Sequence, residues 1–408
     1  MSDESDMTDE SDIEEFAFEH EEVDPITFQA ETKSVRALML EVEDKELDIA
    51  PSWQRGDVWN DAKKRNLIKS LLVGIPLPSL IVFNEKNSMS SILDGKQRMT
   101  AISQYMDDDF SLKNYKEDKQ LNGFKLKECQ NKLFSELPDA AKRKIRQTLI
   151  PVTNLKNLDK DQVYVIFELY NTSGTNLNAA EIRNAVYRDD PVHQLAYEMA
   201  ADGVSHYPDI VPKTYHAQVE LFTEEIRNYV YNFKPKEQNR LNAVDFIERY
   251  LGYSTCTSAP GKKFKKSSTK DTIRMFYKHG AIGTDIDDLC KELVDVLSTA
   301  SSVSTGFTNI GFTKENKFNG LFATTTMVLS KVIFSAKELK LVTDSRVKEI
   351  LTILDSKITP PENQSSTTIW RYQSEWVTGF LGQLDQNDVK KINLQLPNLT
   401  SASRQVMG

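Results

Sequence analysis

The fold depends on the stretch Ser91-Ile92-Leu93-Asp94-Gly95-Lys96-Gln97-Arg98-Met99-Thr100, because the hydrophobic period changes there from strand to helix across five polar residues. Before it, the apolar runs 80–83 and 91–93 predict two short strands joined by the polar turn 84–87. After it, apolar residues recur at helical spacing from Met99 onward. The stretch therefore predicts a strand, a tight turn at Asp94-Gly95 and a helix.

The turn has the composition of an anion site. Gly95 can adopt a positive φ, which leaves Lys96, Gln97 and Arg98 on the first helical turn. Backbone N–H groups and the positive end of the helix dipole favour an anion there, and Arg98, expected to be exposed, adds a bidentate fork suited to a phosphate. The alternative is an ordinary turn followed by solvated surface charges. Spacing alone favours that alternative.

A second motif lies upstream, in Ile49-Ala50-Pro51-Ser52-Trp53-Gln54-Arg55-Gly56-Asp57-Val58-Trp59. Together with 94–98 it resembles the GmrSD type IV restriction endonuclease N-terminal domain family (domain of unknown function 262), which has a ParB/sulfiredoxin-like nucleotide-binding fold. The family pattern is Pro-x-x-Gln-Arg-x-x-x-Trp, a helix, a Pro-x-Pro link, two strands and Asp-Gly-Gln-Gln-Arg. This chain has Lys96 where the family usually has Gln.

A third match extends the resemblance to roughly residues 28–187. Asn171-Thr172-Ser173-Gly174-Thr175-Asn176-Leu177 and Glu181-Ile182-Arg183-Asn184-Ala185 follow the family ending Asn-x-x-Gly-x-x-Leu…Glu-x-Arg-Asn. The resemblance implies that Asp94 positions a water or a divalent metal, and that Lys96 and Arg98 offset phosphate charge. The further residues expected to bind nucleotide are Gln54, Arg55, Gly95, Gln97, Asn171, Arg183 and Asn184.

We expect an α+β protein, with a small mixed sheet and helices first and an all-helical region after it. The expected order is a disordered acidic leader over 1–25, a nucleotide-binding domain over 26–190, a helical extension over 191–253, a flexible lysine-rich loop over 254–270 and a helical C-terminal domain over 271–408.

Local signals give individual elements. Ser34, Asn60 and Thr284 are expected as helix N-caps, and Pro138 as the start of another helix. Strands are expected over 26–28, 110–112 and 146–152.

Charge is distributed unevenly along the chain. The formal net charge is −9, but residues 1–24 hold twelve acidic residues and no Lys or Arg, so the remainder carries +3. We expect the leader to be a disordered, solubilising tail; alternatively, it mimics nucleic acid and covers a basic groove. Lys262, Lys263, Lys265 and Lys266, around Phe264, could contact nucleic acid by counterion release, although most short clusters of this kind are simply solvated.

Several function classes lack their signals. No apolar run is long enough to span a bilayer and no basic secretory signal is present, so we expect a cytoplasmic protein. Cys129, Cys256 and Cys290 show no paired spacing, which argues against a disulfide framework or a zinc site. The closely grouped histidines of an HNH nuclease, with which the complete nucleases of the resembled family cut, are absent beyond Tyr253, as is a Walker-type loop.

The sequence thus predicts a nucleotide-binding, NTP-hydrolysing module of a restriction, defence or regulatory system, without its own HNH nuclease. NTP, together with Mg²⁺, would be its cofactor, and DNA and a separate nuclease or effector its partners. Phosphoryl transfer needs positioning and charge neutralisation more than a covalent nucleophile. The alternative is a nucleotide-switched DNA- or protein-binding adaptor with no significant catalysis, which the substitution at Lys96 keeps open.

Overall fold

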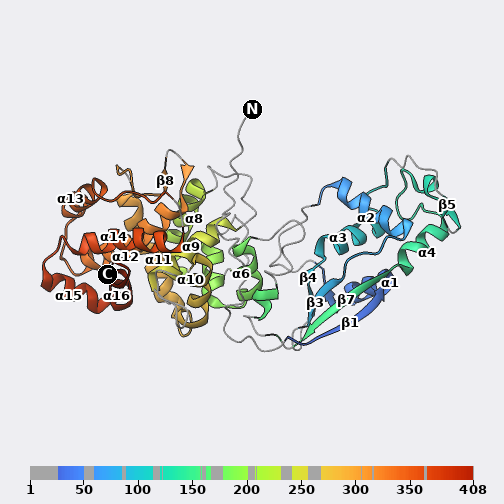
Figure 1. Cartoon of the computed structure of the whole chain (residues 1–408), viewed down its shortest axis with the longest axis horizontal. Coiled ribbons are helices and arrows are strands. Elements are labelled where there is room, and N and C mark those ends of the chain that lie inside the picture. Colours follow the sequence, from blue (N-terminus) through green and yellow to red (C-terminus); the bar gives the residue numbers. More distant parts are fainter. Residues whose placement is uncertain are drawn as a thin grey trace. The chain divides into compact units, whose positions relative to one another are not determined.

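The computed structural model describes residues 26–49, 59–84, 89–113, 120–121, 123–156, 158, 162–166, 178–200, 207, 209–230, 241–255, 268–304, 306–314, 317–362 and 365–407. The described residues form two compact units. The N-terminal unit ends at Val186, and the C-terminal unit begins at Tyr187. Figure 1 labels the elements of both.

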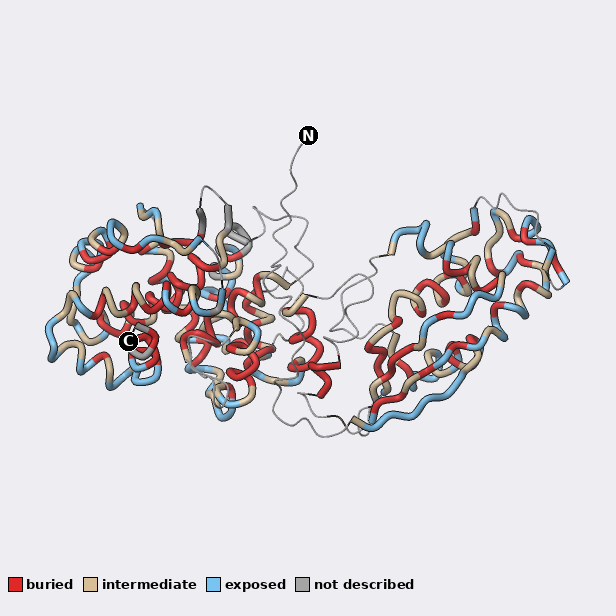
Figure 2. The backbone as a smooth tube through the Cα atoms, viewed as in Figure 1, coloured by how far each residue is buried: buried red, intermediate tan, exposed pale blue. Residues whose placement is uncertain are grey.

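The N-terminal unit contains a five-stranded mixed sheet. Its strands, in spatial order, are β1 (Phe28–Ser34), β7 (Leu149–Lys156), β3 (Leu80–Asn84), β4 (Ser90–Asp94) and β2 (Leu47–Asp48). The pairs β1/β7 and β3/β4 are antiparallel, whereas β3/β7 and β2/β4 are parallel. β1 forms one edge, and its first five residues are exposed (Figure 2). The sheet and the helices that follow confirm the predicted α+β class.

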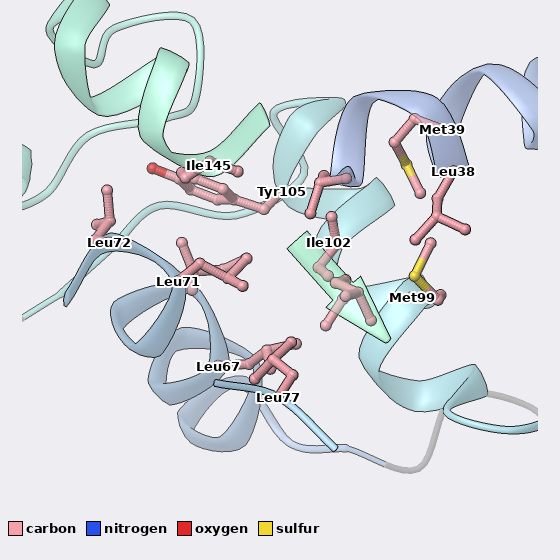
Figure 3. Packing of buried hydrophobic residues seen from close by; sticks show 14 of the residues in the cluster. Leu38, Met39, Leu67, Leu71, Leu72, Leu77, Met99, Ile102, Tyr105 and Ile145 are labelled. Atoms are coloured by element: carbon pink, nitrogen blue, oxygen red, sulfur yellow. The ribbon is translucent and has the colours of Figure 1, made fainter. Parts of the chain in front are cut away.

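Four helices pack on one face of this sheet: α1 (Val35–Glu43), α2 (Asp61–Val73), α3 (Lys96–Met106) and α4 (Asp139–Gln147). Figure 3 shows their buried side chains directed toward one another, among them Leu38 of α1, Leu71 of α2, Ile102 of α3 and Ile145 of α4. The 3-10 helix η2 (Leu126–Cys129) and the hairpin β5 (Gln120–Leu121) and β6 (Phe124–Lys125) complete the unit.

Helix ends agree with the polar residues that predict them. Ser34 accepts a hydrogen bond from the backbone N–H of Ala37 (3.2 Å), and Asn60 accepts one from Lys63 (3.0 Å), so both N-caps are confirmed. α4 follows Pro138 directly, as predicted. The N-cap predicted at Thr284 was one residue too early, because Asp285 caps α11 (Ile286–Val303).

Three strand predictions need correction. The strand predicted over 26–28 begins only at Phe28 and continues to Ser34 as β1. The strand predicted over 146–152 begins at Leu149, because the residues before it complete α4. The prediction over 110–112 was wrong. The N–H and C=O of Leu112 bond to Lys132 (3.1 Å) and Asn131 (2.6 Å), residues of a turn and not of a strand.

The C-terminal unit is built from helices. After α6 (Ala179–Tyr187), which ends at the boundary, they are α7 (Pro191–Met199), η3 (Lys213–Tyr215), α8 (His216–Val230), α9 (Asn242–Thr255), α10 (Thr269–Met275), the π-helical η6 (Phe276–Gly280), α11, α12 (Gly320–Glu338), α13 (Asp344–Asp355), α14 (Ser366–Leu381), α15 (Gln386–Gln395) and α16 (Pro397–Met407). The apolar residues of α12, α13 and α14 recur at helical spacing, in agreement with the helical region expected over 271–408.

Two features of this unit were not predicted. A short hairpin, β8 (Thr313–Lys314) and β9 (Lys317–Phe318), interrupts the helices, and two-residue strands are too short to leave a period in the sequence. α12 is buried along most of its length and contacts α9, α11 and α14. Even so, in the part of the chain that the structure describes, no helix combines the length and hydropathy needed to cross a membrane.

Candidate functional site

The candidate site begins where β4 ends at Asp94 and α3 starts at Lys96. Gly95 joins them with φ +103°, so the predicted positive φ is confirmed. A Cβ on Gly95 would stand 2.2 Å from Cδ2 of Leu80, closer than any real contact. Only glycine satisfies both the backbone conformation and the available space.

The first turn of α3 has an N-terminus suited to an anion. Gly95 occupies the N-cap position and has no side chain that could cap the first turn. The first backbone N–H groups of any helix have no partner within the helix, and the dipole is positive at this end. Lys96 and Gln97, both half-buried, lie on this turn.

Arg98 is mostly buried, with 11% of its side chain exposed, so the expected exposed position was wrong. Its Nη2 donates to Asp94 Oδ2 (2.8 Å) and to the backbone oxygen of Ser79 (3.0 Å), and its Nη1 donates to the backbone oxygen of Pro78. The reason is that the segment entering β3 runs beside the first turn of α3 and presents two carbonyl groups to the guanidinium. Burial lowers the pKa of Arg98, and the Asp94 carboxylate acts in the opposite direction.

Asp94 remains accessible, with 43% of its side chain exposed. In the sheet, Ile81 of β3 pairs with Asp94 on one side and with Thr153 of β7 on the other, and the register of β3 with β4 shifts between Ile81 and Val82. Ser79 Oγ lies 3.1 Å from Thr153 Oγ1. The strands beside the turn therefore supply a carboxylate and one hydroxyl group, and the Ser79 hydroxyl lies directly before β3.

Gln97 links the turn to the segment that precedes α2. Its Oε1 accepts a hydrogen bond from the backbone N–H of Trp59 (3.3 Å). Trp59 is the last residue of the upstream motif, so the two motifs meet at this bond. Gln54 and Arg55, which belong to the same motif, lie outside the described residues.

The remaining predicted residues have different environments. Arg183 and Asn184 lie on α6 and are 1% and 4% exposed, so both are core residues of that helix. Asn171 and the loop residues Lys262, Lys263, Lys265 and Lys266 lie outside the described residues.

Sequence reasoning missed three residues that shape the turn: Pro78 and Ser79, through their carbonyl groups, and Thr153. A backbone acceptor leaves no signal in a sequence. Pro78 is part of the Pro-x-Pro link, but a proline there does not reveal which donor its carbonyl group accepts.

The described residues hold no group of three or more His, Cys, Asp or Glu placed to bind a metal ion. A nucleotide-bound Mg²⁺ needs fewer protein ligands, because it commonly uses one or two protein carboxylates together with phosphate oxygens and water. Asp94 fits that requirement. The residues are thus compatible with a metal ion that arrives with the nucleotide.

Comparison with known proteins gives one result. A search of curated proteins finds no match to the chain. Residues 38–188, which include β3, β4, α3 and the Asp94-Gly95 turn, match the family model described as GmrSD restriction endonuclease, N-terminal domain. The chain therefore carries, over these residues, a domain of the GmrSD restriction endonuclease N-terminal family.

Proposed function

We propose that residues 38–188 form a nucleotide-binding, NTP-hydrolysing module of a restriction or defence system. The observation that carries this proposal is the turn at Gly95: a helix N-terminus with glycine at the N-cap, an accessible carboxylate directly before it and an arginine that fixes both. The family match supports the restriction or defence context.

In this proposal the phosphates lie against the first turn of α3. The backbone N–H groups after Gly95 donate to phosphate oxygens. Lys96 adds positive charge, and the Gln97 amide fixes the neighbouring segment through Trp59. Asp94 orients a water molecule or holds a Mg²⁺ bound to the phosphates.

Arg98 acts mainly as a positioning residue. Its bonds to Pro78, Ser79 and Asp94 hold the end of β4 against the start of α3. Its charge lies within the first turn of α3 and still helps to neutralise phosphate charge, since an arginine stays protonated in a folded protein. Direct bidentate contact with a phosphate would require it to exchange at least one internal bond.

The test measures binding of each of the four NTPs by calorimetry and their hydrolysis by phosphate release, with Mg²⁺ present. Lys96→Ala should weaken binding about 10- to 100-fold, the size expected for loss of one charge-assisted hydrogen bond. Asp94→Asn keeps an oxygen that can accept from Arg98, so it should lower turnover while the protein stays folded. Lys63→Ala is the matched control, because Lys63 lies on the first turn of α2, whose N-terminus Asn60 already caps.

Each outcome has a defined meaning. Binding that depends on Lys96 but shows no turnover would replace the hydrolase by a nucleotide-switched adaptor, the alternative that Lys96, in place of the usual family Gln, keeps open. If the wild-type chain binds none of the four NTPs, or if Lys96→Ala and Lys63→Ala behave alike, the site assignment is wrong. Dependence of DNA cleavage on a separate nuclease or effector stays a prediction, tested by incubating the pure chain with plasmid, Mg²⁺ and NTP.

A further inference from the structure

A strongly basic segment lies in the N-terminal unit, away from the sequence motifs. Residues 123–156 hold eight Lys and Arg against three Asp and Glu, a net charge of +5. Four of the cations fall within five positions of α4: Lys142, Arg143, Lys144 and Arg146. This local charge contrasts with the net charge of −9 for the whole chain.

The core fixes which face of α4 the cations occupy. Ala141 and Ile145 are fully buried against the other helices, which sets the opposite side of α4 toward solvent (Figure 3 shows Ile145 in the core). Arg143, Lys144 and Arg146 are all exposed. We call these three residues the α4 basic face.

Few acidic groups offset the α4 basic face. Among the described residues, none of its three cations forms an ion pair, although five other cations pair with a carboxylate three or four positions away on their own helices. Two of the three acidic residues in the segment accept hydrogen bonds from nearby backbone N–H groups. Glu128 accepts from Lys125 (3.0 Å), and Glu136 accepts from Leu133 (2.9 Å).

One of the cations, Arg146, is held in place by a neighbouring aromatic ring. The Arg146 guanidinium carbon lies 5.1 Å from the centre of the Phe134 ring, a cation–π contact that orients the side chain. Lys144 Nζ lies 3.1 Å from the position that a Cβ on Gly74 would take, next to the C-terminus of α2. The face is thus partly preorganised.

α1 extends the positive surface. The N–H of Val35 donates to the oxygen of Thr148 (2.9 Å), which brings the start of α1 beside the end of α4. The next residue, Arg36, is exposed and has no ion-pair partner among the described residues. Hydrogen bonds from Ser135 lower the pKa of the Asp108 carboxyl, and the nearby charge of Lys142 on α4 adds to this effect, so the charge of Lys142 is partly offset.

We propose that the α4 basic face, extended by Arg36, binds the phosphate backbone of duplex DNA. Duplex DNA carries one negative charge per about 1.7 Å of its axis, so unpaired cations on a rigid helix release counterions when they contact it. Arginine in particular matches phosphate oxygens with its planar fork. The face offers charge and few groups that read base edges, so it binds without strong sequence preference. This inference does not depend on the nucleotide site.

The test measures binding of the full chain to a fluorescent DNA duplex by anisotropy, over a series of salt concentrations and with two unrelated sequences. The triple variant Arg143→Ala, Lys144→Ala and Arg146→Ala should bind at least about ten-fold more weakly at low salt. The slope of log affinity against log salt should become shallower by about 1 for each phosphate that the variant no longer neutralises. Both sequences should respond alike.

The matched control removes three positive charges elsewhere. Lys348, Lys357 and Lys390 are exposed, lie apart from one another on the C-terminal unit and form no ion pair with a described residue. Their triple alanine variant should bind DNA as the wild type does. Circular dichroism and thermal melting of both triple variants verify that they fold.

Three results would overturn the proposal. The first is no salt-sensitive DNA binding by the full chain, and the second is equal loss of binding in the two triple variants. The third is binding that appears only after residues 1–24 are deleted, which would make the acidic leader, and not DNA, the occupant of the face. A duplex RNA of the same sequence that binds more tightly than the DNA would likewise reject DNA as the preferred partner.

Discussion

Gly95 is the residue whose replacement the turn tolerates least. Gly95→Ala combines a left-handed backbone conformation, which costs about 1–2 kcal/mol for a residue with a Cβ, with overpacking against Leu80, which costs about 1–3 kcal/mol. We expect a loss of about 2–5 kcal/mol in local stability, measured as faster hydrogen exchange in peptides that cover β4 and α3.

A second glycine separates the two contributions. Gly283 has φ +74° and nothing within 4 Å of its Cβ position, so Gly283→Ala should cost only the backbone term, about 1 kcal/mol, in peptides that cover α11. Equal effects of the two substitutions would show that Leu80 moves aside without cost.

Cys129 and Cys290 should resist chemical modification in the folded chain. Burial raises the pKa of each thiol to about 11, and both side chains are fully buried. At pH 8.5 we therefore expect no alkylation of their peptides by iodoacetamide in native protein and complete alkylation in guanidinium, measured by mass spectrometry.

The raised pKa values of these two thiols determine whether the stability of the fold rises or falls with pH. A thiol whose pKa is raised in the folded state contributes stability that is fully present below its unfolded pKa of about 8.5. That stability is lost as the pH rises through about 11. Rapid alkylation of Cys129 in native protein, or stability that increases over this range, would contradict the assignment.

At the scale of elements, a buried polar network joins three helices of the C-terminal unit. Glu248 of α9 lies 2.9 Å from His193 Nδ1 of α7 and accepts from the hydroxyl of Tyr277 of η6 (2.7 Å), with the His193 and Glu248 side chains fully buried. Tyr277 also stacks on Tyr187, with ring centres 4.2 Å apart. The network fixes the π-helical turn against α7 and α9.

Tyr277→Phe keeps the stacked ring and removes one donor from the Glu248 carboxylate. Loss of a hydrogen bond to a buried carboxyl group should cost about 1–3 kcal/mol, measured by urea denaturation of the full chain. Tyr215→Phe is the control: Tyr215 is half-exposed and its hydroxyl bonds to no described residue, so its change should stay within about 0.5 kcal/mol. If Tyr277→Phe leaves the free energy of unfolding unchanged, the network does not stabilise the helices.

Elements differ in how far the sequence predicts them. The segment β3–β4–α3 could be predicted from the sequence because the spacing of its apolar residues changes from strand to helix within five residues and glycine marks the turn. The buried position of Arg98 could not be predicted from the sequence, because its hydrogen-bond partners include backbone carbonyl groups some 20 residues upstream. A strand over 110–112 was predicted from apolar residues that a turn, and not a strand, accommodates.

At the scale of the whole molecule, charge separates the leader from the rest of the chain. Residues 1–24 carry −12 and the remainder +3. A segment so acidic and so poor in apolar residues has little surface to bury, so we expect it to add nothing to the stability of the folded units. Its deletion should change the melting temperature by less than about 2 °C, which corresponds to less than roughly 1 kcal/mol for domains of this size.

Salt distinguishes this expectation from a leader that docks on the α4 basic face. A docked leader would stabilise the N-terminal unit through charge pairs, so its deletion would lower the melting temperature at about 20 mM salt and much less at about 500 mM, where screening is strong. The Arg143, Lys144 and Arg146 triple alanine variant would then lose the same salt-dependent stability with the leader still present. If the leader is detached, deletion of residues 1–24 should leave the melting temperature unchanged at each of the two salt concentrations. A drop of several degrees confined to low salt would instead show that the chain covers its own basic face.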